Sequence, residues 1–441
     1  MLSKTLLTAA AGNTENNYWL SVVGAGNINN EDMASVVRDS DGNLYMLATG
    51  QGGLIFKYNS SGVLQWQKTL TAGNFVGRGI DCDSSGNVYL AGDTMISSVQ
   101  KTVVMKLNSS GTIQWQVVAD HSSTYPDLPC RGLATDGTSV FVISLSYNGS
   151  GYEPALLSYD CSNGTNNWFR QLSTTSFRFM NAICIDGNSN VYATGGQFNP
   201  TGANNQGSYD MIIAKWDSSG TLQWNHKIGD QHPSQCEGWG IAYCSHSNAV
   251  YVTGAIGNDI LFAKYDVNGN IQYRKYADNN LGFVARGNAI AADGQGYLYI
   301  TGESTINAGG QRHMVIQKWT QQGGLVFTRD IGGLTYNNFG YGITANADGC
   351  VAVGSTYLYG QTSSDAFVIS IPIDGTLTGN YTTTFSNTII SYTSVSYSSS
   401  FSAFSALPGT LTVNNTYSAN HNTPTYSTSN TSLQSALTYL N

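Results

Sequence analysis

One short stretch recurs along the chain, and it constrains the possible folds more than any other feature. Its clearest copy is DSSGNVYLAG at residues 83–92, and a longer copy, DSDGNLYMLATG, covers residues 39–50. More divergent copies cover residues 186–195, 293–302 and 346–354. A Ser-Gly or Asp-Gly turn before a run of Val, Leu and Tyr is typical of a β-hairpin. The stretch therefore predicts an all-β chain.

The residues around this stretch predict a repeating unit of four antiparallel strands. In the second unit, strand a covers residues 79–83 and strand b covers residues 87–92. Strand c covers residues 103–108, and strand d covers residues 112–118 after a second Ser-Gly turn. Short apolar runs joined by tight turns favour a meander of neighbouring hairpins.

The end of strand b marks seven such units. Several units carry a lysine in strand c, expected at blade edges, and an aromatic residue in strand d, expected to pack between blades. The alternative for the aromatic residues is stacking on sugars. Four strands in a period of about 50 residues predict a seven-bladed β-propeller rather than a linear solenoid. The marks are Gly50, Gly92, Ser144, Gly195, Gly254, Gly302 and Gly354.

The seventh unit lacks its fourth strand, and the start of the chain supplies a candidate. Gly379 stands where an aromatic residue is expected, whereas residues 17–24, with Tyr18 and Trp19, resemble strand d of the fourth unit. We therefore expect residues 17–24 to be strand d of the seventh blade and to close the ring. Closure would remove the edges that an open array exposes.

Composition divides the chain into three parts. Residues 1–16 are predicted to be an N-terminal assembly arm, residues 17–378 the propeller, and residues 379–441 a Ser/Thr-rich assembly extension. No Asp, Glu, Lys or Arg occurs from Gly375 to Asn441. Ordering such a tail costs about 1.5 kcal/mol per residue, so we expect it to pack on other subunits.

The end of the tail has apolar residues at helical spacing, at Leu433, Ala436, Leu437 and Leu440. Thr431 and Gln434 are spaced as in a capping box. This pattern predicts a short C-terminal helix.

Charge and motifs exclude several classes of function. The net charge of −8 provides no basic surface for nucleic acid. The sequence has no run of about 18 apolar residues, so membrane insertion is not expected.

The seven cysteines form no CxxC, so we expect buried free thiols. Asp39 begins a calcium-like sequence that lacks the distal Glu, so a turn is favoured. We expect the chain to have no catalytic residue and to bind no metal or cofactor. We therefore do not expect the protein to be an enzyme.

Three arginines are the candidate ligand-binding residues. Arg78, Arg131 and Arg286 each precede a glycine near the start of strand a. Because strand a lines the axis of a propeller, the three guanidinium groups could converge at one mouth of the channel and hold a carboxylate, a phosphate or a sugar acid. The alternative is that each arginine pairs with a local acid or carbonyl group.

The units resemble the bacterial β-propeller repeat known as SBBP, whose pattern is approximately GIAVD-SSGNVYVTG followed by AKYDSSGTIQW. Residues 79–115, 186–224 and 240–273 carry the resemblance. The whole layout is similar to proteins of marine tailed phages, notably cyanophages. Residues 1–12, 18–24 and 373–381 (IDGTLTGNY) correspond to their start, their YWL strand and their junction with a Ser/Thr tail.

The second resemblance implies a structural component of a phage virion, on the tail or the capsid surface. The propeller would be displayed, and the arms would bind other virion proteins and copies of the same chain. A carbohydrate-binding propeller that recognises host surface glycans is the alternative, and the two functions could coexist in an adhesin. An enzyme would require acids or histidines clustered at a channel mouth.

Overall fold

The computed structural model contains strands and turns and no helix in the residues that it describes. None of these residues therefore forms a helix that could span a membrane. The predicted N-terminal arm, residues 1–16, lies outside them. The described residues are 18–24, 33–49, 53–70, 75–96, 99–120, 129–147, 152–173, 178–199, 208–228, 235–278, 284–305, 310–332, 337–357, 364–375, 379–382, 389–394, 398–401, 407–408, 412–414, 420–422, 428–430 and 434–440.

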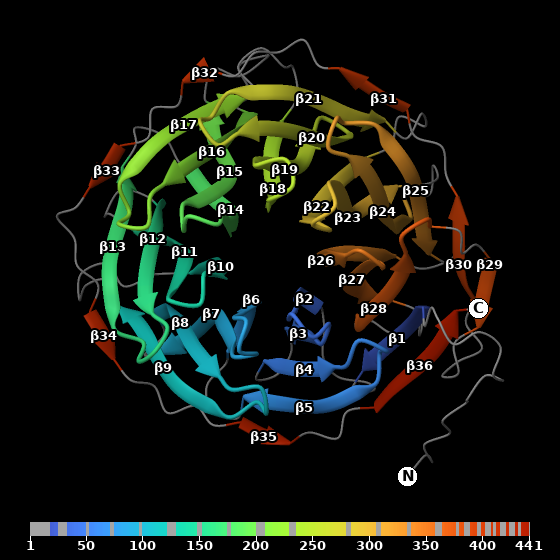
Figure 1. Cartoon of the computed structure of the whole chain (residues 1–441), viewed down its shortest axis with the longest axis horizontal. Helices are drawn as coiled ribbons and strands as arrows, with labels where there is room; N and C mark the ends of the chain where they lie inside the picture. Colours follow the sequence, from blue (N-terminus) through green and yellow to red (C-terminus); the bar gives the residue numbers. More distant parts are fainter. Residues whose placement is uncertain are drawn as a thin grey trace.

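Seven antiparallel sheets are arranged around a central axis like the blades of a propeller (Figure 1). The predicted all-β, seven-bladed β-propeller is therefore confirmed. The innermost strands, strands a, are β2 (Met33–Arg38), β6 (Val76–Cys82), β10 (Cys130–Thr135), β14 (Arg178–Ile185), β18 (Cys236–Cys244), β22 (Ala285–Ala292) and β26 (Asn338–Asn346). Strands b are β3 (Leu44–Ala48), β7 (Val88–Ile96), β11 (Ser139–Tyr147), β15 (Val191–Asn199), β19 (Ala249–Ile256), β23 (Tyr297–Thr305) and β27 (Gly349–Thr356).

The two outer ladders of each blade continue the meander. Strands c are β4 (Leu54–Tyr58), β8 (Val99–Leu107), β12 (Tyr152–Asp160), β16 (Ser208–Trp216), β20 (Asp259–Asp266), β24 (Arg312–Thr320) and β28 (Asp365–Pro372). Strands d are β5 (Leu64–Leu70), β9 (Ile113–Asp120), β13 (Asn166–Ser173), β17 (Leu222–Ile228), β21 (Ile271–Asp278), β25 (Leu325–Gly332) and, for the seventh blade, β1 (Tyr18–Gly24).

The N-terminal strand closes the ring as expected. β1, which contains Tyr18 and Trp19, pairs antiparallel with β28, with Leu20 opposite Ile369 and Val22 opposite Phe367. The first and seventh blades also share a hydrophobic cluster that includes Met46, which is fully buried. Such clusters lie between neighbouring blades around the ring, and each fully buried aliphatic side chain contributes about 1.5–3 kcal/mol. Closure therefore combines a ladder of hydrogen bonds with an apolar interface.

The repeated Asp-Ser-Ser-Gly-Asn stretch is a turn held by its aspartate. The Asp83 carboxylate accepts hydrogen bonds from Ser85 N, Asn87 N, Asn87 Nδ2 and Tyr89 OH at 2.8–3.0 Å. Burial by itself would raise the pKa of Asp83, but these hydrogen bonds lower it below the ordinary value. Gly86 has a φ of 73°, which favours glycine. Asp39 accepts equivalent bonds from Asp41 N and Asn43 N, as a turn requires.

The strand-c lysines and strand-d aromatic residues join each blade to the next. In the second blade, Lys106 Nζ and Trp115 Nε1 both donate to Cys161 O of the third blade, at 3.0 Å each. Lys106 Nζ also lies 5.4 Å from the centre of the Tyr89 ring. The aromatic residues therefore pack between blades, as expected. The lysines do more than lie at blade edges, because each stabilises the following turn.

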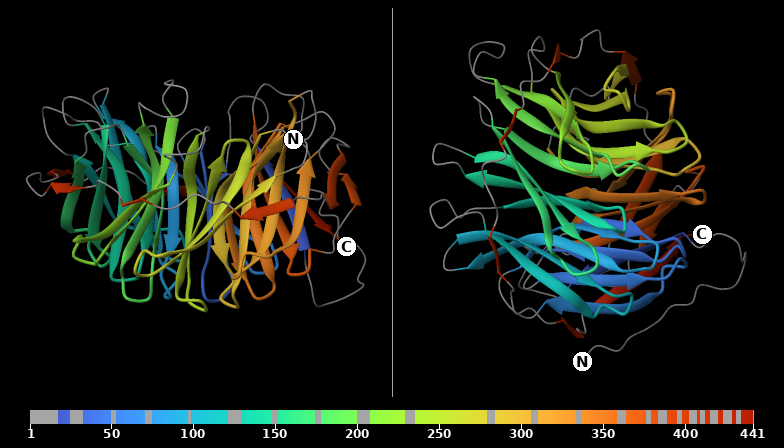
Figure 2. Two further views of the ribbon diagram at one scale, coloured as in Figure 1. Left: turned by 90° about the horizontal axis from the view of Figure 1, so that it is seen from above. Right: turned by 60° about the vertical axis from the view of Figure 1, so that its left-hand side comes forward.

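The tail gives every blade a further strand. Its strands follow the outer wall of the ring, in the order opposite to that of the blades (Figures 1 and 2). They pair antiparallel with the strands d, and β29 (Gly379–Thr382) pairs with β30. The other tail strands, from the sixth blade round to the seventh, are β30 (Ile389–Ser394), β31 (Ser398–Phe401), β32 (Leu407–Pro408), β33 (Thr412–Asn414), β34 (Asn420–Asn422), β35 (Thr428–Asn430) and β36 (Gln434–Leu440).

Two sequence-based expectations about element positions are wrong. Residues 434–440 form strand β36, not a helix, and pair with β1 over its full length. The strand is favoured because β1 offers backbone partners that an isolated short helix lacks. The first unit ends strand b at Ala48, which pairs with Met33 as Gly92 pairs with Gly77. Ala48, not Gly50, is therefore the first of the seven marks.

Candidate ligand site at the channel mouth

A β-bulge interrupts the first ladder of every blade near the start of strand a. Between Gly77 and Gly79, for example, Arg78 has no partner on β7. A bulge places an extra residue in one strand and redirects its side chain. We call the seven unpaired residues the bulge ring. They are Ala34, Arg78, Arg131, Asn181, Trp239, Asn288 and Tyr341.

In the fifth blade, the two glycines that flank the bulge have little space for side chains. A Cβ added at Gly238 would lie 2.1 Å from Thr194 Oγ1 of the preceding blade. A Cβ added at Gly240 would lie 2.8 Å from the Cα of Ala289 in the following blade. Adjacent inner strands therefore approach closely on both sides of the bulge. A large side chain at this level of strand a fits at the unpaired position.

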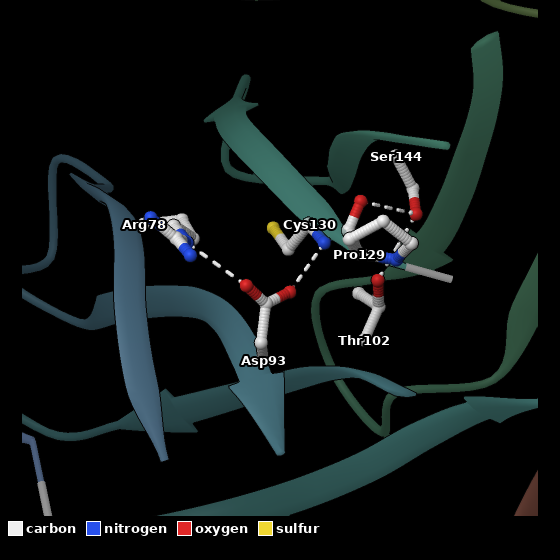
Figure 3. Close-up of polar contacts among 6 residues, drawn as sticks. All are labelled: Arg78, Asp93, Thr102, Pro129, Cys130 and Ser144. Carbon is white, nitrogen blue, oxygen red and sulfur yellow. Dashed lines mark hydrogen bonds and ion pairs between the residues drawn. The ribbon is translucent and has the colours of Figure 1, made fainter. Parts of the chain in front are cut away.

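Arg78 and Asp93 join the second and third blades at this level (Figure 3). Arg78 Nε lies 2.8 Å from Asp93 Oδ2, and Cys130 N donates to Asp93 Oδ1. Burial raises the pKa of Asp93, and the Arg78 guanidinium opposes the shift. The Asp93 side chain is 4% exposed, whereas that of Arg78 is 42% exposed. The ion pair thus has a buried carboxylate and an accessible guanidinium.

Arg131 occupies the equivalent bulge in the third blade. Its side chain is exposed and forms no hydrogen bond or ion pair with the other residues that the structure describes. Burial of its surroundings and the neighbouring charge of Arg78 lower the pKa of Arg131, while Asp93 opposes this. Two adjacent guanidinium groups therefore have one carboxylate nearby, and this carboxylate pairs with Arg78 alone, which leaves an excess of positive charge at this point.

Arg286 does not occupy the same place as the other two arginines. Gly287 pairs with Gly302 as Gly77 pairs with Gly92, so Arg286 corresponds to Val76. Its guanidinium carbon lies 5.0 Å from the ring centre of Trp239, in the fifth blade. The structure therefore brings together Arg78 and Arg131, and Asn288 takes the corresponding position in the sixth blade.

The remaining members of the bulge ring divide into structural and accessible residues. Asn181 Nδ2 donates to Gly238 O at 2.9 Å, and Asn288 Nδ2 donates to Gly340 O at 2.9 Å, so both amides join neighbouring blades. Trp239 is half-buried, and Tyr341 is 37% exposed. An alignment of the strands a on the residue after each bulge, which is always Gly, Ala or Ser, would have revealed the ring from sequence.

The third blade differs from the others inside the interface, not on a surface. Ser144 and Ser158 replace the usual Gly and Lys, and both are buried. Ser144 Oγ lies 3.1 Å from Thr102 Oγ1 and donates to Pro129 O at 3.0 Å (Figure 3). Asn167 Nδ2 donates to Ser158 Oγ. The two hydroxyl groups therefore satisfy buried polar neighbours, and neither serine contributes to an exposed surface.

Asp81 lies on the same inner strand as Arg78 and links the second blade to the third. Its carboxylate accepts hydrogen bonds from Cys82 N and Thr135 N at 2.9 Å each. Burial raises the pKa of Asp81 to about 6, although both hydrogen bonds oppose the shift. A raised carboxyl pKa means that the folded state binds the proton more tightly than the unfolded state does.

We expect Asp81 to make the protein less stable as the pH rises from about 4 to 6. Asp81→Asn should remove this component. Relative to the unsubstituted protein, the variant should be about 1–2 kcal/mol more stable at pH 8 than at pH 4.5, after allowance for solvent screening. Urea unfolding of both proteins across this pH range measures the difference. A difference that does not vary with pH would contradict the assignment.

The comparisons with known proteins concern the fold alone. No family model matches the chain, and no curated protein matches its sequence. Among solved structures, hydrazine synthase of Kuenenia stuttgartiensis is similar with a TM-score of 0.48 and 13% identity, over 73% of this chain and 92% of that one. The C-terminal WD40 domain of Sif2 has a TM-score of 0.45 and 10% identity, over 77% and 82%. Sqt1 of Chaetomium thermophilum has a TM-score of 0.44 and 10% identity, over 82% and 99%.

Proposed function

We propose that the protein is a structural component of a tailed-phage virion, located on the tail or the capsid surface. The propeller is displayed, and the two terminal arms bind other virion proteins and further copies of the chain. The likeness of residues 1–12, 18–24 and 373–381 to marine phage proteins supports this function. The chain acts by binding and assembly rather than by catalysis.

The tail carries the structural argument for assembly. It has no charged residue after Asp374, and its strands pair by backbone hydrogen bonds with the outer strand of each blade. Addition of a strand to an open sheet edge is a common mode of protein recognition. Exchange of the tail between two copies would place the same strands on the same edges of the neighbouring copy, which supports homo-oligomeric contacts.

Deletion of residues 379–441 tests this function directly. Phage particles that carry the deletion should lack the protein, because its outer edges lose the strands that hold it in the virion. Quantitative mass spectrometry of purified particles measures the amount incorporated. A control with the same tail residues in shuffled order separates the effect of sequence from that of length. Incorporation of the deleted protein at the normal level would contradict the proposed role of the tail.

A carbohydrate-binding adhesin is the second candidate function. The bulge ring favours it, because exposed Arg131 and Tyr341 and half-buried Trp239 occupy equivalent bulges and offer a charge and two aromatic rings. Sugars bind to such combinations through hydrogen bonds and stacking on the rings. Binding of the full chain to an array of host surface glycans tests this candidate independently of incorporation into virions.

A further inference from the structure

The second and third blades place two positive charges side by side in the bulge ring. Arg78 and Arg131 occupy equivalent bulges of β6 and β10, which are adjacent inner strands. Both residues are exposed. The chain as a whole is acidic, with a net charge of −8, so this pair is a local exception.

The neighbouring acid is already fully used. One oxygen of Asp93 accepts from Arg78 Nε, and the other accepts from Cys130 N. Arg131 has no acidic partner among the described residues, and the 42% exposure of the Arg78 side chain leaves part of that guanidinium in solvent. The two arginines and Asp93 together carry a net charge of about +1 at neutral pH. This excess matches one carboxylate better than a dianionic phosphate.

Guanidinium groups bind carboxylates through paired, charge-assisted hydrogen bonds. The other members of the bulge ring differ in what they can offer to a ligand. The Asn181 and Asn288 amides already bond to Gly238 O and Gly340 O. Trp239 is half-buried beside the Arg286 guanidinium, and Tyr341 is 37% exposed. Aromatic rings pack against the apolar faces of sugars as they do against other flat apolar groups.

We propose that Arg78 and Arg131 bind the carboxylate of an acidic sugar, a uronic acid, at the mouth of the channel. This inference rests on the second candidate function and names its ligand class. Arg131 is the main determinant, because Arg78 is also engaged by Asp93.

Calorimetric titration of the full-length protein with glucuronate, glucose and acetate tests the proposal. Glucuronate should bind at least about tenfold more tightly than glucose, since the neutral sugar makes no charge-assisted bond. It should also bind more tightly than acetate, which lacks the sugar ring. Affinity should fall as ionic strength rises, because the contact is electrostatic.

Arg131→Ala should weaken glucuronate binding by at least about tenfold, because the charge-assisted hydrogen bonds to the carboxylate are lost. Arg131→Lys should retain part of the affinity, because it keeps the charge without the planar fork. Lys68→Ala is the control, since it removes one positive charge from β5 on the outer side of the first blade. Unfolding curves for each variant show that the fold is kept.

The outcomes separate this inference from the function on which it rests. The acidic-sugar site is ruled out if glucuronate binds no more tightly than glucose. It is also ruled out if glucuronate binds equally well to Arg131→Ala and to the unsubstituted protein. If neutral glycans still bind in that case, the carbohydrate-binding function stands without it. If neither glycans nor glucuronate bind, both the acidic-sugar site and the carbohydrate-binding function are ruled out.

Discussion

Gly302→Ala is expected to destabilise the protein by about 3 kcal/mol or more, although it adds only a methyl group. A Cβ at Gly302 would lie 1.8 Å from Arg286 O. The clashing atom belongs to the backbone of the neighbouring strand and cannot rotate away. Strand a of the sixth blade would therefore shift, and Arg286 would shift with it. Guanidinium-induced unfolding measures the loss of stability.

Gly187→Ala provides the matched control. A Cβ at Gly187 meets no atom within 4 Å, and this glycine does not have a positive φ. The control should change the stability by less than about 0.5 kcal/mol. Equal losses of stability in the two variants would show that the clash between a Cβ at Gly302 and Arg286 O is not the cause of the destabilisation.

Deletion of residues 13–24 is expected to have the largest effect on the fold. β1 lies between β28 and β36 and pairs with both. Its loss would expose the edge of β28 and release the last strand of the tail. We expect a loss of more than about 5 kcal/mol, which is of the order of the whole stability of a domain. Size-exclusion chromatography and thermal unfolding would detect aggregation or partial unfolding.

Deletion of residues 1–12 is the control for this experiment, because it shortens the same end of the chain and leaves β1 intact. It should melt like the full-length protein. A deletion of residues 13–24 that also melted like the full-length protein would contradict the closing role of β1.

The repeating unit was predictable because its signals are local. Asp83, Gly86, Asn87 and Tyr89 lie within seven residues, and their hydrogen bonds form inside that turn. Ring closure was predictable for a different reason. The fourth strand absent from the seventh unit and the additional strand at Trp19 were both visible as departures from a regular spacing.

Elements that depend on distant partners were harder to predict. The end of the tail has helical spacing, yet residues 434–440 form a strand because the edge of β1 was available to them. The three Arg-Gly pairs look alike in sequence, but Arg286 lies two positions before the bulge level that Arg78 occupies. A bulge adds one residue to a strand without a change in local composition, so a comparison of short motifs cannot place it.

By itself, the sequence determined the four-stranded unit, the number of blades and the strand that closes the ring, since each follows from turns and spacing along the chain. Only the tertiary structure decided which residue of each inner strand is unpaired, and that Arg78 and Arg131 are neighbours. The physical reason is that neighbouring blades approach closely beside the bulges, where a Cβ added at Gly79, Gly240 or Gly342 would lie within about 3 Å of the next blade's backbone. Those contacts join residues that are far apart in the sequence.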